Sequence, residues 1–429
     1  QEADITGAVE SFVKYSYLVK NVNDIPRVFK EAFHIANTGR RGPVLIDVPI
    51  DIQNAVISKF KYPETVSMRT YKHTVKGNAV QIKKVVKELE KAKQPIICAG
   101  GGVLLSEAQE ELRRFAETHG IPVVSTMMGL GAVSTDSPLY YGMIGMHGCK
   151  SANMAINTCD TLILLGARVG DRSIAEMKKR ENLQVVHIDI DPAEIGKNIG
   201  VNVPIVGDLT LVLGQLLDQL TDKLDHSEWR RKLDEYRVEK PVKAAAEGFV
   251  NPKLFIKTLD KYLPTHSVVV ADVGSNQMWT AANITINDGR FLTSGGMGTM
   301  GYAIPAALGA KAADPSAEVV AVCGDGSFQM QMMELATALL HDIAIKVIVM
   351  RNNYLGMVRE LQEKAYGSRR VAVSLDGSPS YTKIAEAYGI ETVLCDSEDM
   401  IDGAIERMIS SDKPFLIEVA VEEFEKTIL

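Results

Sequence analysis

Cysteine is scarce in this sequence: five residues among 429, scattered along the chain and without a C-x-x-C pair. A zinc site or a disulfide framework is therefore not expected, and we predict reduced, mostly buried thiols in a cytoplasmic compartment. No apolar run approaches the roughly 18 residues that suggest a membrane span. Acidic residues outnumber basic ones, 54 against 47. The net charge thus gives no reason to expect nucleic acid or an anionic membrane as a partner.

Strand-like apolar runs alternate with amphipathic helical segments along most of the chain. This alternation is typical of α/β domains built on parallel sheets, and the length allows two or three such domains. Polar stretches without clear periodicity separate three blocks, which we expect at 1–55, 75–240 and 250–429. In the first block we expect one or two helices over 8–37 and a strand only at 43–49. Because the chain opens on Gln rather than Met, we expect it to begin inside a domain.

Two strand ends in the last block carry an unusual combination of polar side chains. The apolar run VVAVC stops at Gly324-Asp325-Gly326, and the run IKVIVM stops just before Asn352. The interval of 27 residues (352 − 325) matches one strand–helix–strand crossover, so both side chains should emerge at the same edge of a parallel sheet. A carboxylate and an amide oxygen are hard ligands suited to Mg²⁺ or Ca²⁺, and phosphate oxygens and water would complete the shell.

Each of these features alone has an ordinary explanation. A G-D-G sequence after a strand is usually a turn, and Asn-Asn is common in loops. The combination is much rarer, and the backbone N–H groups of Gly326 and Ser327, which open the next helix, favour an anionic phosphate. We therefore predict a divalent metal ion bridged to a diphosphate at this edge.

Six further segments narrow the interpretation: GPVLIDVPIDI, MGLGAVSTDSPLYYGMIGMHG, GARVGDR, HIDIDPAEIGKN, VGSNQMW and SGGMGTMGYAIPAALGAK. In this order, and over essentially the whole chain, they resemble the large, catalytic subunit of acetohydroxyacid (acetolactate) synthase, a thiamine-diphosphate enzyme. The resemblance implies a C-terminal remnant of a pyrimidine-binding domain at 1–55, a central FAD-binding-type domain at 75–240, and a thiamine-diphosphate and Mg²⁺-binding domain at 250–429. It also implies the reaction, in which pyruvate is decarboxylated and its acetaldehyde unit joins pyruvate or 2-oxobutyrate in branched-chain amino-acid synthesis.

The resemblance assigns the thiamine-diphosphate site residue by residue. The Mg²⁺ ligands are expected to be Asp325, Asn352 and the backbone carbonyl of Tyr354. Met300 is implied to support the cofactor in its bent form, and the Gly298 carbonyl to accept a hydrogen bond from the pyrimidine amine. The other residues expected around the cofactor are Gly274, Ser275, Asn276, Gly326, Ser327 and Met357, while Met297 is expected in the core.

In this family the central domain holds FAD as a structural group. Arg168 suits the flavin diphosphate and Asp189 its adenosine hydroxyls, with His147, Asp208 and Arg40 implied nearby. The ordinary alternative for each charged residue is a surface salt bridge. The chain also departs from the family here, because the usual GARFDDR reads GARVGDR.

The remaining implications concern the substrate and the partners. Arg172 is implied to bind the carboxylate of the second oxo acid through its planar fork of donors. The glutamate that activates the cofactor lies, in the family, before the segment that matches Gln1, so we expect this chain alone to be catalytically inactive. The family's site forms between two subunits, which implies a homodimer or tetramer, with a small regulatory subunit as a possible further partner. We expect the acidic segment 418–429 to be solvated surface.

Two other classes of function stay open from the sequence. One is a different thiamine-diphosphate enzyme, such as a 2-oxoacid decarboxylase, a pyruvate oxidase or a flavin-free catabolic acetolactate synthase; bound flavin without oxidase activity would exclude the flavin-free relatives. The other is a non-enzymatic nucleotide-binding or regulatory module, which failure to bind thiamine diphosphate with Mg²⁺ would favour. A nicotinamide dehydrogenase fits poorly, because GGGV lacks the full G-x-G-x-x-G fingerprint.

Overall fold

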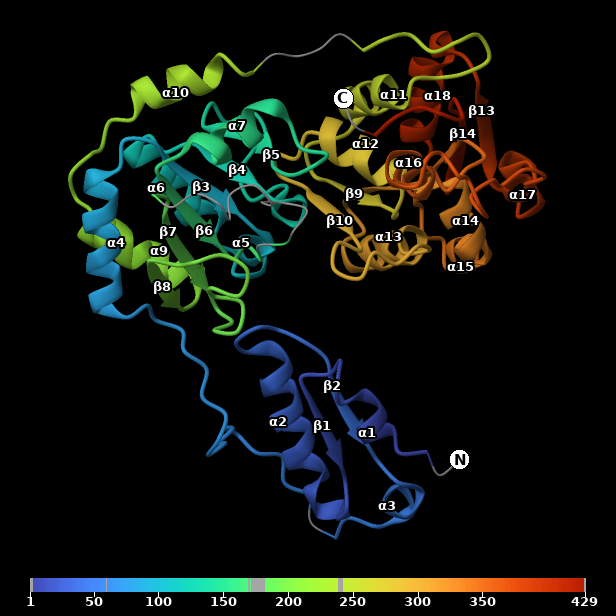
Figure 1. Ribbon diagram of the computed structural model, residues 1–429. Coiled ribbons are helices and arrows are strands. Elements are labelled where there is room, and N and C mark those ends of the chain that lie inside the picture. Colours follow the sequence, from blue (N-terminus) through green and yellow to red (C-terminus); the bar gives the residue numbers. More distant parts are fainter. Residues whose placement is uncertain (1–2, 59, 169, 171–181, 238–241, 428–429) are drawn as a thin grey trace.

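The computed structural model describes residues 3–58, 60–168, 170, 182–237 and 242–427. In this part of the chain three α/β units follow one another, and the first lies apart from the other two (Figure 1). The strands form one two-stranded sheet and two six-stranded sheets, and every pairing between named strands is parallel. The predicted α/β class with parallel sheets is therefore confirmed.

The first unit is small. Strand β1 (Tyr15–Leu18) pairs with β2 (Val44–Asp47), and its buried core consists of Val19, Val28 and Ile52 with half-buried neighbours. Its helices are α1 (Ile5–Val9), the 3₁₀ turn η1 (Val22–Asp24), α2 (Ile25–Asn37) and α3 (Ile50–Asn54). The expectation of helices throughout 8–37 was wrong at β1. The four residues YSYL are only partly buried and include a serine, so their strand conformation depends on pairing with β2 more than on local pattern.

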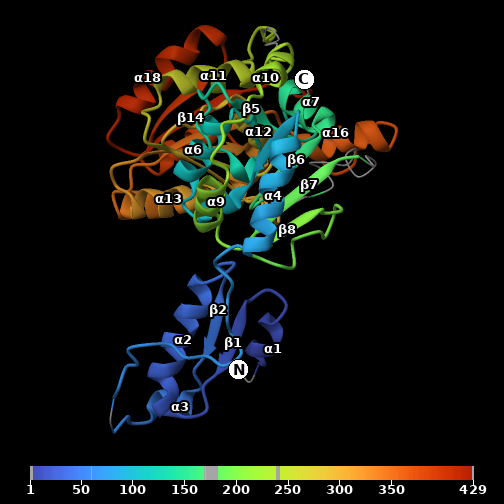
Figure 2. The ribbon, with the colours of Figure 1, turned by 90° about the vertical axis from the view of Figure 1, so that its left-hand side faces the viewer.

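An extended segment connects the first unit to the second, with no helix or strand between α3 and residue 79 in the described residues. Its Tyr71 hydroxyl accepts a hydrogen bond from Lys14 Nζ at 2.8 Å. Arg40 of the first unit reaches the second, where it pairs with Asp191 at 2.9 Å and with Glu194 at 3.0 Å. These carboxylates lie in the turn after β7 (Gln184–Asp189), and Figure 2 shows the first unit below the sheet that contains β7.

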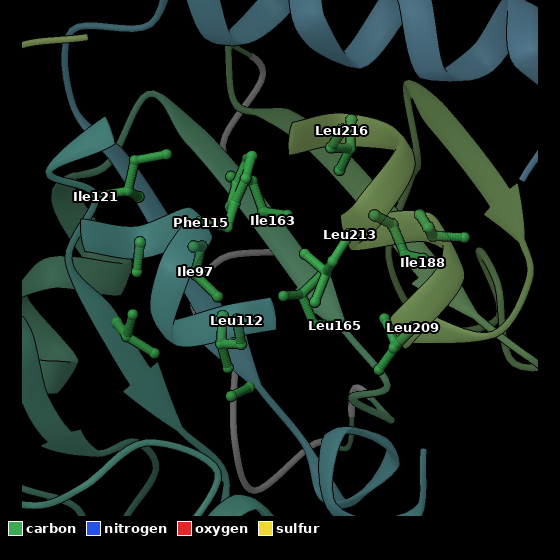
Figure 3. Close-up of a cluster of buried hydrophobic side chains, with 14 of the residues drawn as sticks. Ile97, Leu112, Phe115, Ile121, Ile163, Leu165, Ile188, Leu209, Leu213 and Leu216 are labelled. Carbon is green, nitrogen blue, oxygen red and sulfur yellow. The ribbon is translucent and has the colours of Figure 1, made fainter. Parts of the chain in front are cut away.

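The second unit is a six-stranded sheet in the order β5-β4-β3-β6-β7-β8. Alternate residues of β3 enter different cores, because side chains alternate across a strand: Ile97 packs with α4, α6 and α9, whereas Ile96 packs with α7. Figure 3 shows the first of these cores between the sheet and helices α6 and α9. The strands are β3 (Pro95–Ala99), β4 (Val123–Ser125), β5 (Tyr140–Met143), β6 (Thr161–Leu165), β7 (Gln184–Asp189) and β8 (Val203–Val206). The helices are α4 (Ala79–Lys91), α5 (Gly101–Leu105), α6 (Gln109–His119), η2 (Met127–Gly129), α7 (Lys150–Thr158), α9 (Leu209–Gln219) and α10 (Ser227–Asp234).

The third unit repeats this architecture in the order β10-β9-β11-β12-β14-β13. Val320 and Val322 of β11 face helices α11, α12 and α18, while Val319 and Ala321 face α13, α15 and α17. The strands are β9 (Ser267–Ala271), β10 (Arg290–Thr293), β11 (Glu318–Gly324), β12 (Lys346–Arg351), β13 (Glu391–Cys395) and β14 (Phe415–Ala420). The helices are α11 (Pro252–Tyr262), α12 (Ser275–Asn283), α13 (Ala303–Ala313), α14 (Asp325–Gln331), η4 (Met332–Glu334), α15 (Leu335–Leu340), α16 (Gly356–Ala365), α17 (Tyr381–Ala387), η5 (Glu398–Met400) and α18 (Ile401–Ser410).

Polar contacts join the second and third units directly. The backbone N–H of Ile286 donates to the Thr135 hydroxyl at 2.9 Å, and Ser134 donates to the Asn287 side chain at 2.7 Å. These contacts lie beyond strand β4 on one side and helix α12 on the other. The limits 1–55, 75–240 and 250–429 stay predictions for the domain boundaries. No helix in the described residues has the length and apolar character that crossing a membrane requires.

Candidate functional site

The two strand ends identified in the sequence lie side by side. Strands β11 and β12 are neighbours in the sheet, and Asp325 and Asn352 follow their last residues directly. Asp325 Oδ2 accepts hydrogen bonds from the backbone N–H groups of Asn352, at 3.0 Å, and Asn353, at 2.6 Å. Asp325 Oδ1 accepts from the backbone N–H of Gly326 at 2.8 Å. The crossover spacing thus correctly predicted the proximity of the two residues.

The Asp325 carboxylate sits in an environment that favours a cation. The residue is 2% exposed, and burial raises its pKa to about 6, against the opposing effect of the three backbone N–H donors. Burial raises the pKa because a carboxylate loses hydration when it leaves water. A divalent cation beside the carboxylate would offset that loss, so the chemistry of this group fits the predicted metal ion.

The turn after Asn352 is held from several sides. Asn352 is 4% exposed, and its Oδ1 accepts from the Tyr354 backbone N–H at 3.2 Å. Asn353 has a φ of 56°, in the left-handed region that asparagine tolerates better than most residues. Backbone hydrogen bonds of 2.8 Å each join Leu355 to the Val373 carbonyl and the Asn353 carbonyl to Leu375. The residues 352–355, hereafter the metal-loop turn, are therefore fixed by the neighbouring loop as well as by Asp325.

A buried hydroxyl without a partner lies beside this turn. Ser275, the first residue of α12, is 6% exposed, and its Oγ has no hydrogen-bond partner among the described residues. A Cβ atom placed on Gly356 would lie 2.3 Å from Ser275 Oγ and 3.2 Å from Asn352 Nδ2, so both polar groups border the same glycine. An unpaired buried hydroxyl is costly unless a ligand satisfies it. The residues present therefore fit a diphosphate at this edge.

The Asn276 side chain holds neighbouring backbone together and is not free to donate to a phosphate. Its side-chain amide donates to the Asp272 carbonyl at 2.8 Å and to the Val322 carbonyl at 3.0 Å. Both hydrogens of the amide are thus engaged, so what Asn276 offers a phosphate is its backbone N–H. Ser327 is similar, because its hydroxyl donates to the Gly324 carbonyl at 3.1 Å. Gly274, which precedes α12, has a φ of 149° that a residue with a side chain rarely adopts.

The loop after β10 brings a third segment to the same place. A Cβ atom on Gly326 would lie 3.4 Å from Met300 Cε, so Met300 approaches the start of α14. Gly298 has a φ of 72°, which glycine adopts without strain. Met297, expected in the core, is 90% exposed, so that expectation was wrong. Met357 is partly buried in the first turn of α16, which follows the metal-loop turn.

Asp272, which was not among the predicted site residues, connects two of these segments. It is fully buried at the end of β9, and its Oδ1 accepts from the backbone N–H of Val273 at 2.8 Å and of Gly301 at 3.0 Å. Its Oδ2 accepts from the backbone N–H of Ala303 at 2.8 Å. Burial raises the pKa of Asp272, and the backbone donors oppose that shift. The sequence pattern that could have identified Asp272 is SVVVAD, in which a carboxylate ends an apolar strand as it does in VVAVCGD.

The residues predicted to hold FAD lie at the corresponding edge of the second unit. His147, Arg168 and Asp208 follow β5, β6 and β8, respectively, and Asp189 is the last residue of β7; strands β6, β7 and β8 are adjacent. Asp189 accepts from the Asp191 backbone N–H at 2.9 Å, and burial raises its pKa. Asp208 caps α9 by accepting from the Leu211 backbone N–H at 3.3 Å.

Two other predicted residues are placed differently. Arg40 reaches the same edge from the first unit, where it pairs with Asp191 and Glu194 close to Asp189. Arg172, predicted to bind the second oxo acid, lies outside the described residues, so its role stays a prediction. Among the described residues no group of three or more His, Cys, Asp or Glu side chains could hold a metal ion. The proposed ion therefore depends on one carboxylate together with amide and carbonyl oxygens.

The comparisons with known proteins identify the class. The chain matches the family model of the thiamine pyrophosphate enzyme central domain over 82–216, and that of the C-terminal TPP binding domain over 272–419. The chain thus belongs to the thiamine pyrophosphate enzymes.

Individual relatives narrow the family further. A probable acetolactate synthase large subunit of Methanococcus aeolicus is 40% identical over 98% of this chain and 74% of its own length. The acetolactate synthase large subunit of Lactococcus lactis is 38% identical over 100% of this chain and 75% of its own length, and that of Haemophilus influenzae is 37% identical over 99% and 76%. The chain belongs to the acetolactate synthase large-subunit family.

Proposed function

We propose that this chain supplies part of an acetolactate-forming site by binding thiamine diphosphate through one Mg²⁺ ion at the carboxyl ends of β11 and β12. That the chain alone is inactive stays a prediction. The substrates are pyruvate and, as acceptor, a second 2-oxo acid, either pyruvate or 2-oxobutyrate. The observation that carries the proposal is the convergence of three buried groups: the Asp325 carboxylate, the Asn352 amide and the unpaired Ser275 hydroxyl. The family relationship supports it independently.

Each element of the edge has a part in holding the cofactor. Asp325, Asn352 and the carbonyl of Tyr354 would bind Mg²⁺, because oxygen ligands of this kind suit a hard cation. The Ser275 hydroxyl and the backbone N–H groups of Ser275, Asn276 and Ser327 would bind diphosphate oxygens, with Gly274 allowing the close approach. The Gly326 N–H is already engaged by Asp325 Oδ1, so Gly326 would contribute through the close approach of its backbone. Met300, Met357 and Gly298 would lie against the ring system. When bound, thiamine diphosphate supplies the carbon nucleophile and the electron sink for loss of CO₂.

A second cofactor, FAD, is proposed for the edge of the second unit. Its support is the placement of Arg168, Asp189 and Asp208 at the carboxyl ends of three adjacent parallel strands, with Arg40 held nearby and His147 after β5. Ligands of parallel sheets bind beyond such strand ends. The flavin absorbance of purified protein tests this proposal. Absence of bound flavin, with no binding of added FAD, would favour a flavin-free acetolactate synthase instead.

Assembly and substrate recognition complete the proposal. The proposal extends to a homodimer or tetramer, to a regulatory subunit as a further partner and to a cytoplasmic location; the description of the relatives as large subunits supports a further subunit. Arg172 is retained as the residue that binds the acceptor carboxylate, because a guanidinium offers two parallel donors to a carboxylate. Light scattering during gel filtration reports the oligomeric state. Binding of the acceptor oxo acid by the Arg172→Lys variant, compared with binding by the unaltered chain, tests whether the two parallel donors of the guanidinium are required.

The central experiment is calorimetric titration with Mg²⁺ and inorganic pyrophosphate, which probes the metal site without the ring. The unaltered chain should bind, and Asp325→Asn should weaken binding about ten- to a hundredfold, because a charged ligand is lost. The matched control is Asp218→Asn, an exposed residue on α9, which should bind like the unaltered chain. Absence of binding by the unaltered chain, or equal binding by Asp325→Asn, would overturn the proposal.

A further inference from the structure

The acidic segment after β14 is not the solvated surface that its composition predicted. Residues 422–427, hereafter the tail, run along α16 and α12 and are fixed at several points. The Glu360 carboxylate accepts hydrogen bonds from Thr427 N at 2.9 Å and Thr427 Oγ1 at 2.8 Å. The Trp279 indole N–H donates to the Lys426 carbonyl at 3.1 Å. An ordered backbone with this many partners has a structural purpose beyond solubility.

A buried arginine organises the tail. Arg359, in α16, is 0% exposed, and its guanidinium donates to the backbone carbonyl of Glu423 and, at 3.3 Å, to that of Glu425. The carboxylates of Glu360 and Glu363 lie 3.7 and 3.6 Å from its nitrogen atoms. A buried cation is tolerated only where such partners replace water. The carboxylates of α16 thus compensate the charge, while the guanidinium binds the tail.

The same arginine lies between the tail and the metal-loop turn. Its guanidinium carbon is 5.2 Å from the centre of the Phe424 ring and 6.0 Å from that of the Tyr354 ring. The two rings themselves are 5.7 Å apart, with an angle of 44° between their planes. Arg370, on the loop that pairs with the turn, lies 4.5 Å from the Phe424 ring centre. Phe424 therefore contacts the residue whose backbone carbonyl is the third proposed ligand of Mg²⁺.

We propose that Phe424 and Arg359 are positioning residues, which hold the Tyr354 ring and thereby fix the metal-loop turn in its ion-binding shape. The inference rests on the proposed function. The turn contains Asn353 in a left-handed conformation, which is less stable than ordinary backbone and needs support from its surroundings. A turn that is already ordered loses less conformational freedom when the ion binds, so the tail raises the affinity without touching the ion.

The test uses Phe424→Ala, because Phe424 is 46% exposed and its loss should leave the fold intact. The substitution removes the aromatic and cation–π contacts of the ring, so we expect Mg²⁺-pyrophosphate binding to weaken roughly three- to tenfold. Phe424→Tyr keeps the ring and should bind like the unaltered chain. The matched control is Phe33→Ala, an exposed phenylalanine on α2 in the first unit.

Hydrogen exchange of the Leu355 amide provides the second readout, because that amide belongs to the turn and donates to the Val373 carbonyl of the neighbouring loop. The amide should exchange faster in Phe424→Ala than in the Phe424→Tyr and Phe33→Ala variants. Unchanged affinity in Phe424→Ala, or equal loss in Phe33→Ala, would overturn the inference. If the unaltered chain itself does not bind Mg²⁺-pyrophosphate, the proposed function fails, and the exchange comparison still decides whether the tail holds the turn.

Discussion

The carboxylate of Asp272 accepts the backbone N–H of Ala303 at 2.8 Å, so that the end of strand β9 is joined to the start of helix α13. The residues between them, 273–302, include both Ser275 and Met300. Ser275 lies beside Gly356 and Met300 beside Gly326, so both border the proposed metal site. One buried side chain thus sets the spacing of the two segments that we propose to bind the cofactor.

This arrangement predicts a large effect for Asp272→Asn. An asparagine keeps one oxygen but presents an NH₂ group to a backbone N–H on the other side, which leaves buried donors facing each other. We expect the free energy of unfolding to fall by about 1–3 kcal/mol, the cost of a buried unsatisfied polar group. Urea denaturation of the ligand-free protein measures this, with Asp218→Asn as the control. A change within ~0.5 kcal/mol, typical of surface substitutions, would contradict the assigned role.

Ser275→Ala should separate binding from stability. Because Ser275 Oγ is buried and has no partner in the described structure, its removal should leave the unfolding free energy unchanged or raise it. Binding of Mg²⁺-pyrophosphate should weaken roughly three- to tenfold, since one hydrogen bond to the anion is lost. Ser125→Ala gives the opposite control, because the Ser125 hydroxyl is paired with the Tyr140 hydroxyl at 2.7 Å. That variant should lose stability and keep its affinity.

Much of the third unit could be predicted from its sequence because its central strands β11 and β12 are buried on both faces. The runs VVAVC and KVIVM have no polar side chains to satisfy except at their ends. The strands, the crossover between them and the position of the candidate site can therefore be predicted from the pattern of apolar and polar residues. Strand β1 could not be predicted, because four half-exposed residues become a strand only through pairing with β2.

The position of the tail was also hidden from the sequence. Its carboxylates indicate solvent exposure, but its order comes from backbone carbonyls that bind Arg359, a residue more than sixty positions earlier. Likewise, the sequence does not distinguish Asp272 from other polar residues that end a strand. Only the structure shows that its carboxylate oxygens accept hydrogen bonds from the backbone N–H groups of Gly301 and Ala303. Contacts made through backbone atoms leave no residue-type signature, which is why these two features required the structure.

Gly356→Ala should place a methyl group between polar groups of the proposed Mg²⁺-diphosphate site. The added methyl group would lie 2.3 Å from Ser275 Oγ and 3.2 Å from Asn352 Nδ2, both shorter than normal contacts. We expect binding of Mg²⁺-pyrophosphate to weaken about tenfold or more, since two proposed ligand-binding groups must move apart. Gly309→Ala, in the interior of α13 with nothing within 4 Å of its added methyl, is the matched control. It should keep its affinity and gain up to about 1 kcal/mol of stability from helix propensity.

Buried histidines of the second unit predict a loss of stability in mild acid. Burial lowers the pKa of His119, His187 and His226 below the ordinary value of 6.5. The unfolded chain therefore binds these protons more readily than the folded one. Their contribution is fully present above about pH 6.5 and is lost as the pH falls below that value, by up to ~1.4 kcal/mol per pH unit for each histidine.

The measurement is the free energy of unfolding at a series of pH values from about 7.5 to 5.5, the range in which an ordinary histidine titrates. His119→Gln should reduce the slope, because one of the groups that takes up a proton on unfolding is gone. His266 supplies a contrast of opposite sign: its hydrogen bond to Asp314, at 2.7 Å, raises its pKa, so it contributes stability at low pH that is lost as the pH rises. His266→Gln should therefore make the loss in acid steeper. Equal slopes in all three proteins would show that these histidines do not control the acid sensitivity of the fold.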